Sequence, residues 1–280
     1  GVTASATNII AQGWVLSSDI ALRSGTDAHV KGVFTNAATV NLALHGRINQ
    51  KSDILLALLF SPSERGHRKA STAQAFALVG DNYYNPSWGY QSSKIRNANT
   101  ISSVAPTALL SYNRKLSDKQ HLNLSLATTA GSNAYSGLDW LNGSTPLPDN
   151  YRYLPDYFTD AITADAVREA WQRGDSRYTQ INFDELHRRN RLQESAIYLI
   201  NQRVTRTSNL QVAATISHAL SQSLKVNYGL RAEIDRERNF KRVNDLLSGG
   251  EFEDIDFFLV DDDAQSNMLQ KERDIKRGYL

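Results

Sequence analysis

The sequence predicts an all-β fold: a segment of an antiparallel up-and-down transmembrane β-barrel with long extracellular loops, one of which contains a short helix. Three observations support this prediction. Apolar and polar residues alternate with a period of two along several segments. Short polar turns connect these segments at one end, and long loops connect them at the other. No run of about 18 apolar residues, the length of a transmembrane helix, occurs in the sequence.

The composition excludes several other classes of protein. The 280 residues include 31 Lys and Arg against 29 Asp and Glu, so the net charge of +2 gives no electrostatic reason to bind nucleic acid. Cysteine is absent, which excludes disulfide scaffolds, zinc fingers and Fe–S centres. Because the chain begins with Gly1 and its one methionine is Met268, we expect a processed chain or a fragment of a longer protein.

The first predicted strands cover residues 14–22 and 39–48. In the second of these, Val40, Leu42 and Leu44 share one face, while polar residues occupy most of the other face. A strand of this kind separates an apolar environment from a polar one.

The later predicted strands follow the same pattern with some variation. Residues 54–60 are apolar throughout, and residues 104–116 alternate loosely. The alternation is regular again in residues 121–126, 210–217 and 224–234.

The connections between the predicted strands differ at the two ends. Polar turns at residues 49–53, 117–120 and 221–223 are typical of antiparallel hairpins. The long loops at the opposite end are predicted over residues 65–100, 137–194 and 239–280. The whole chain, residues 1–280, is therefore predicted to form one partial barrel domain of about seven strands.

A helix is predicted inside the second long loop. Thr163 is placed to cap the N-terminus of the segment ADAVREAWQR, and Gly174 is placed to end it.

Periodicity by itself leaves a second fold open. In a soluble antiparallel β-sandwich, the apolar face of each strand would point into a core instead of into lipid. Two features favour the barrel. The polar faces carry Asn, Arg, Glu, His and Gly, as a watery lumen requires, and the difference between short turns and long loops repeats at every clear hairpin.

Two loop segments carry a resemblance to a known family. Residues 82–97 read NYYNPSWGYQSSKIRN, and residues 138–155 read LDWLNGSTPLPDNYRYLP. One predicted hairpin separates them. This arrangement resembles the barrel portion of large TonB-dependent outer-membrane receptors of Bacteroidetes type. Weaker matches at residues 61–66, 199–206 and 245–250 extend the resemblance along the chain.

The resemblance implies an internal segment of such a barrel in the outer membrane of a Gram-negative bacterium. It implies energised import of a nutrient of the glycan, peptide, siderophore or cobalamin class, without covalent chemistry. The implied partners are the TonB complex, acting through a plug region that the chain lacks, the nutrient, outer-membrane lipid and a surface lipoprotein. A passive porin or structural outer-membrane barrel, and a soluble β-sandwich that binds glycans, remain the alternatives.

Aromatic residues in the two matching loops are the candidate substrate-binding residues. They are Trp88, Tyr90, Trp140, Tyr151 and Tyr153. Aromatic side chains with a few polar groups are typical of ligand sites. Packing between the loops, or an aromatic belt at the membrane interface, is the alternative role and the one that we favour.

Two charged segments are further candidate sites. The basic stretch could meet an anionic substrate or lipopolysaccharide, although a solvated loop surface is the favoured interpretation; it comprises His187, Arg188, Arg189 and Arg191. The acidic stretch comprises Glu251, Glu253, Asp254, Asp256, Asp261, Asp262 and Asp263. Its oxygens suit Ca²⁺, but the spacing of a calcium-binding loop is absent, so no metal site is predicted. Motifs of hydrolases, zinc proteases and phosphate-binding loops are absent too, so we predict no catalytic residue, cofactor or enzymatic activity.

Overall fold

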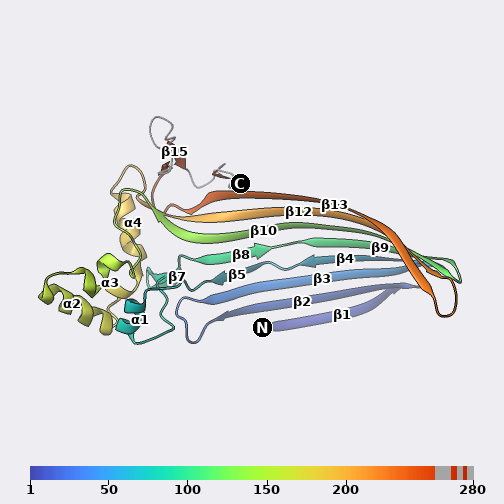
Figure 1. The fold of residues 1–280 in the computed structure, drawn as a ribbon, viewed down its shortest axis with the longest axis horizontal. Helices are drawn as coiled ribbons and strands as arrows, with labels where there is room; N and C mark the ends of the chain where they lie inside the picture. Colours follow the sequence, from blue (N-terminus) through green and yellow to red (C-terminus); the bar gives the residue numbers. More distant parts are fainter. Residues whose placement is uncertain (256–265, 270–273, 276–280) are drawn as a thin grey trace.

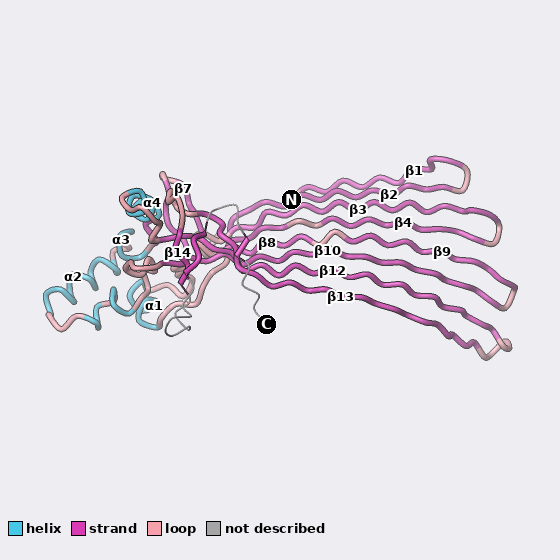
Figure 2. Tube along the Cα trace, turned by 90° about the horizontal axis from the view of Figure 1, so that it is seen from above, coloured by secondary structure: helices cyan, strands magenta, loops and turns pink. Residues whose placement is uncertain are grey.

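The computed structural model describes residues 1–255, 266–269 and 274–275. Most of the chain forms one large antiparallel sheet of eleven strands. Its long strands run side by side from short turns at one end to a group of loops and helices at the other (Figures 1 and 2). The two ends therefore differ as the sequence predicts, and the fold class is confirmed.

The strands of the large sheet follow each other in space in nearly the order of the sequence, β1-β2-β3-β4-β9-β10-β12-β13-β16, with β5 and β8 off this path. Their bounds are β1 Val2–Ala11, β2 Trp14–Thr26, β3 Phe34–Asn49, β4 Ser52–Phe60, β5 Ser63–Gly66, β8 Thr100–Val104, β9 Thr107–Ser117, β10 Gln120–Trp140, β12 Tyr198–Ala219, β13 Lys225–Asp245 and β16 Asp274–Ile275. All the neighbouring strands are antiparallel, which is the up-and-down arrangement.

Two of the long strands are interrupted where a proline occurs. Pro62 separates β4 from β5, and Pro106 separates β8 from β9. A proline has no N–H to give to the sheet, so it breaks a strand or lies at its end. The carbonyl oxygens of both prolines still accept hydrogen bonds from the next strand, at Ala38 and Ala130, and the sheet continues past each interruption.

Smaller elements form the loop region, which we define as residues 67–99, 141–197 and 246–255. Its elements are α1 Ala73–Val79, β6 Trp88–Gln91, β7 Lys94–Asn97, the 3-10 turns η1 Tyr151–Tyr153 and η2 Pro155–Tyr157, α2 Ala161–Gln172, α3 Ser176–Thr179, β11 Ile181–Asn182, α4 Phe183–Arg191 and β14 Phe252–Ile255, which pairs with β15 Ser266–Leu269. The buried apolar clusters lie mainly here, around Trp171, Phe183 and Phe252, and not along the middle of the large sheet.

The structure corrects several details of the predicted elements. It adds β1, which the sequence analysis did not identify, and it places helices in both of the first two long loops instead of one. The N-cap of α2 is Asp160, whose carboxylate accepts a hydrogen bond from the backbone N–H of Thr163, so the prediction of Thr163 as the cap is wrong. Gly174 does end the helix, in the left-handed conformation at φ 67°.

The predicted boundaries of the second and third long loops also shift. β10 continues to Trp140, and β13 continues to Asp245 instead of ending before residue 239. The alternation of apolar and polar residues fades there, because this part of each strand lies beyond the apolar band described below. The backbone ladder between β12 and β13 nevertheless continues.

Candidate ligand-binding loop region and barrel surfaces

One face of the large sheet is a continuous apolar surface. The strand register aligns leucines and a valine into one row across five strands, namely Leu44, Leu56, Leu110, Leu126 and Val212. These side chains remain open to the surroundings: Leu56 is 39 % exposed and Val212 is 50 % exposed. An apolar sheet face of this extent needs a non-aqueous partner.

The opposite face of the same strands is polar and internally hydrogen-bonded. Asn123 donates to the Asn113 side-chain oxygen at 2.8 Å, and Asn113 donates to Asp53 at 3.0 Å. His45 lies 3.4 Å from the same carboxylate. Within the described residues, no second sheet packs over either face, so the β-sandwich alternative is wrong.

A buried side chain of α4, Asn190, connects the loop region to the sheet. Its amide nitrogen donates to the carbonyl oxygens of Tyr198, Leu246 and Leu247 at 2.7 to 3.1 Å. Its side-chain oxygen accepts from the backbone N–H groups of Ile197 and Tyr198, both at 3.0 Å. Asn190 therefore joins α4 to the start of β12 and to the end of β13.

A pocket of about 300 Å³ lies in the loop region. Aromatic side chains line part of it, namely Tyr153, Phe158, Tyr178 and Tyr198. Polar and charged side chains line the rest, and these include Ser144, Thr145, Arg177, Asn182, Glu185 and Arg189. A mostly apolar wall with a few fixed polar groups is the usual composition of a ligand pocket.

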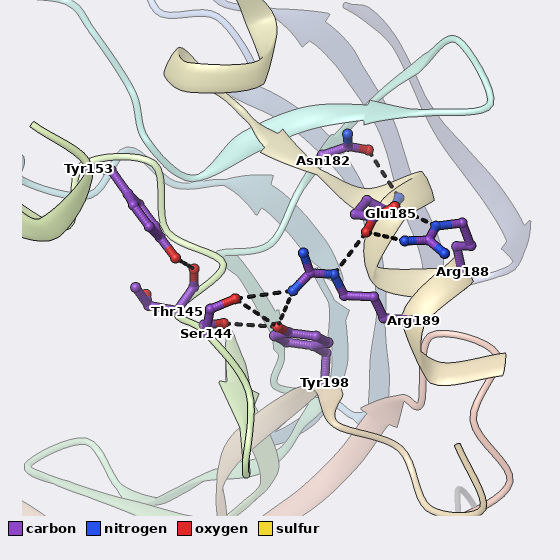
Figure 3. Close-up of polar contacts among 8 residues, drawn as sticks. All are labelled: Ser144, Thr145, Tyr153, Asn182, Glu185, Arg188, Arg189 and Tyr198. Carbon is purple, nitrogen blue, oxygen red and sulfur yellow. Dashed lines mark hydrogen bonds and ion pairs between the residues drawn. The ribbon is translucent and has the colours of Figure 1, made fainter. Parts of the chain in front are cut away.

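Arg189 organises the polar side of this pocket (Figure 3). Its Nε donates to Glu185 at 2.8 Å, and its Nη1 donates to Ser144 Oγ at 3.1 Å and to the Tyr198 hydroxyl at 3.3 Å. The Tyr198 hydroxyl in turn donates to the Ser144 carbonyl oxygen at 2.9 Å. The guanidinium thus links α4, the loop after β10 and the start of β12 in one network.

The charged groups of the network are one carboxylate and two guanidinium groups. Hydrogen bonds from Arg188 and Arg189 lower the pKa of Glu185 to about 2, although burial opposes this shift. The same contacts raise the pKa of both arginines. Asn182 caps α4 by accepting a hydrogen bond from the Glu185 backbone N–H, which fixes the carboxylate at the helix N-terminus. One carboxylate shared by two guanidinium groups leaves a surplus positive charge beside the pocket.

The structure distributes the five sequence-predicted residues over different surroundings. Tyr153 lines the pocket and donates its hydroxyl proton to the Thr145 carbonyl oxygen at 2.8 Å. Trp88 is 5 % exposed and packs edge-on against Tyr90, with the Lys31 ammonium over its ring. Trp140 packs against the cluster around Phe183.

Tyr151 lies in η1 next to Tyr153 but in different surroundings. It is 59 % exposed and pairs with Tyr157. Within the described part of the chain, no aromatic contact joins the Trp88–Tyr90 pair to Tyr151 or Tyr153. A role for the five residues in ligand binding stays a prediction.

Sequence reasoning missed several residues of the pocket. It did not single out Ser144, Asn182, Glu185 or Tyr198, which come from three separate segments of the chain. It did notice Arg188 and Arg189, but it favoured a solvated surface for them. The spacing of Glu185, Arg188 and Arg189 could have indicated their ion pairs, because residues three and four apart meet on one side of a helix.

The structure describes only the beginning of the acidic stretch. Asp256 and Asp261–Asp263 lie outside the described residues. Over the residues that are described, no group of three or more His, Asp or Glu side chains is arranged to hold a metal ion. None of the described helices has the length and apolar character needed to cross a membrane.

An exposed apolar face, a polar opposite face, short turns at one end and a loop region at the other define the wall of an outer-membrane-type β-barrel. No protein-family model matches the sequence. No curated protein matches it either.

Solved structures do match this fold. The structure is similar to the open form of the ferric-catecholate import receptor Fiu from E. coli, with a TM-score of 0.54 and 10 % sequence identity, over 85 % of this chain and 32 % of that receptor. The closed form of Fiu matches over 85 % of this chain and 30 % of the receptor, with a TM-score of 0.52 and 10 % identity. The chain thus spans about a third of the length of the receptor. At this identity, the likeness concerns the fold alone.

Proposed function

We propose that this chain forms barrel wall and outer loops of a TonB-dependent outer-membrane receptor that actively imports a nutrient. The observation that carries the proposal is the separation of the sheet into an apolar face and a polar face, in a fold similar to part of the Fiu receptor. The apolar face suits lipid, and the polar face suits a water-filled or plug-filled lumen.

The loop pocket supports capture of the nutrient at the outer end of the barrel. Its aromatic side chains offer flat apolar surface, and Arg189 and Ser144 present polar groups beside it. Fiu is a ferric-catecholate import receptor. For this chain, the proposed nutrient is of the siderophore, glycan, peptide or cobalamin class, as the family resemblance implies.

The proposed partners follow from the same resemblance. TonB would act through a plug region in a longer protein, and a surface lipoprotein would cover the outer loops. The Bacteroidetes type of receptor belongs to this proposal too, because it rests on the loop segments at residues 82–97 and 138–155.

Uptake experiments test the proposal. Labelled members of the four nutrient classes are offered to cells that carry the complete receptor gene, to cells that lack it, and to cells that lack TonB. We expect one class to be taken up only when both the receptor and TonB are present. Uptake that persists without TonB would identify a passive porin, and the proposal would fail.

A pair of neighbouring tyrosines tests the site. Tyr153 lines the pocket, whereas Tyr151 is exposed outside it. We expect Tyr153→Ala to weaken binding of the identified nutrient about tenfold, because aromatic contacts carry a large share of binding energy, while Tyr151→Ala changes it little. If Tyr151→Ala has the larger effect, the exposed aromatic surface and not the pocket binds the ligand.

A further inference from the structure

Residues 235–238 of β13 alternate carboxylates with arginines, so the two kinds of charge lie on opposite faces of the sheet. Arg236, Arg238 and Arg242 lie on the apolar face, since they follow Ile234 at intervals of two residues. Asp235 and Glu237 lie on the polar face. This stretch thus places acidic groups towards the polar side and guanidinium groups towards the side that carries the apolar band, whereas Arg231 and Lys241 lie on the polar side.

The register brings two of these cations face to face. Arg206 of β12 lies directly opposite Arg238 of β13. Like charges directly opposite each other destabilise an antiparallel pair unless an anion lies between them. On the same face, two residues closer to the short turns, Arg236 of β13 lies opposite Ser208 of β12. A third guanidinium is therefore next to the opposed pair.

The described residues supply no anion for this cluster of Arg206, Arg236 and Arg238. Among the described side chains, none of the three takes part in an ion pair. All three are exposed. The acidic side chains of β13 are occupied on the other face, where Asn209 donates to Asp235 at 2.5 Å and Asn239 donates to Glu237 at 2.7 Å.

One aromatic neighbour orients a member of the cluster. The Arg206 guanidinium stacks over the Phe240 ring at 4.9 Å. Stacking on an aromatic ring orients a guanidinium while leaving its N–H edge free to bind an oxyanion.

The cluster lies just beyond the apolar band. On β13, Leu230 and Ile234 are highly exposed and directly precede it on the same face. An open groove of about 850 Å³ runs across the sheet towards it, lined by small residues such as Ala38, Ser132 and Ala134, and reaching Arg242. Ser132 is the residue of β10 directly opposite Arg206, so the groove and the cluster share one level of the sheet. The groove lining includes one acidic residue, Glu64, which belongs to β5 near the other side of the groove.

We propose that Arg206, Arg236 and Arg238 bind the phosphate of a phosphorylated lipid headgroup in the outer leaflet. The phosphate supplies the anion that the described residues do not offer to the opposed arginines, and guanidinium groups bind phosphate oxygens with paired hydrogen bonds. The acyl chains of the same lipid lie along the apolar band next to the cluster. This inference rests on the proposed function for the placement of the loop region on the outer side of the membrane.

A lipid-binding measurement on the complete receptor in nanodiscs tests the proposal. The probes are bisphosphorylated lipid A, its dephosphorylated form and inorganic phosphate, and the bound lipid is counted by native mass spectrometry. The variant is Arg206→Gln with Arg238→Gln. The matched control is Arg203→Gln with Arg231→Gln, which removes two arginines of the same strands from the polar face.

We expect the complete receptor to prefer the phosphorylated lipid, and the Arg206 and Arg238 variant to bind it about tenfold more weakly. The control should bind it like the unchanged receptor, and inorganic phosphate should not displace it. Equal binding of both lipid forms, full displacement by inorganic phosphate, or unchanged binding by the variant would overturn the proposal.

Two further outcomes distinguish lipid binding from ion pairing inside the receptor and from transport. If the variant unfolds more readily than the control in lipid-free detergent, the arginines pair with carboxylates of the receptor itself, and the lipid proposal is wrong. TonB-dependent uptake is measured separately on the same variant. A receptor that shows the lipid preference but no TonB-dependent uptake would refute the proposed function and leave lipid binding intact.

Discussion

Replacing Asn190 should release the loop region from the sheet. This side chain is 1 % exposed and forms five hydrogen bonds, three as donor and two as acceptor, to backbone groups of residues 197, 198, 246 and 247. In Asn190→Leu, a side chain of similar size keeps the volume filled but leaves these backbone groups without partners. The two N–H groups of Asn190 are shared among three carbonyl oxygens, so at about 1 kcal/mol for each net hydrogen bond the loss is about 4 kcal/mol if every partner stays buried.

The loss of these hydrogen bonds should have its largest effect in the turn that follows β13, because the backbone conformation there is unfavourable. Leu247 and Ser248 have positive φ angles of 49° and 67°, which non-glycine residues adopt at a cost. The bonds from Asn190 to the carbonyl oxygens of Leu246 and Leu247 help to hold this turn. The segment after β13 should therefore open first in the variant.

Hydrogen exchange of the complete receptor measures this opening. If only about 3 kcal/mol is lost locally, the amides of Ile197 and Tyr198 should exchange roughly 100-fold faster, because each 1.4 kcal/mol is about a factor of ten. The control is Gln193→Ala, which removes an exposed amide two residues after α4. The reasoning is refuted if exchange at Ile197, Tyr198 and Leu247 in Asn190→Leu stays within about threefold of the control.

Three further changes test other parts of the loop region. Gly89→Ala should disrupt the pairing of β6 with β11, because an added Cβ would lie 1.7 Å from the Ile181 carbonyl oxygen, and proteolysis of the complete receptor should then cleave the loop region faster than in the unchanged protein. Ser93→Gly should stabilise the β6–β7 turn by about 1 kcal/mol, since Ser93 has a φ of 65°; an unchanged or lower unfolding midpoint would contradict this account. Arg188→Gln should raise the pKa of Glu185 from about 2 towards its ordinary value, as measured by NMR titration of the carboxyl group. Because the folded pKa is lower than the unfolded one, ionised Glu185 stabilises the fold above its ordinary pKa, and this contribution is lost as the pH falls from that value towards 2. In the variant the lost contribution should be smaller and the loss should be complete at a higher pH, and an identical acid profile would exclude Arg188 as the main cause.

The amino-acid sequence determined the strands of the large sheet because their environment is the same along most of their length. A strand between lipid and a polar lumen alternates from residue to residue, and the segments around Leu44 and Leu126 show that period without any knowledge of their neighbours. The sequence analysis did not identify the interruptions before β5 and after β8, since it predicted one strand over residues 104–116, and the paired strands show that the sheet continues across them.

The sequence did less well where several distant segments meet. Asp160, and not Thr163, caps α2, because the helix begins at Ala161, ahead of the predicted segment, and its start depends on how the preceding loop approaches. Trp88 and Tyr153 belong to similar aromatic segments, but one is buried against Lys31 and the other lines the pocket.

The sequence by itself determined the two-faced strands, the short turns and the position of the long loops, since each depends on residues only a few places apart. The tertiary structure alone decided which loop residues meet. The five bonds of Asn190, the network of Arg189 with Ser144 and Tyr198, and the opposition of Arg206 and Arg238 all join strands and helices through registers that no local pattern specifies. The physical reason is that periodicity fixes which face a side chain occupies, whereas pairing across the sheet fixes which other side chains share that face.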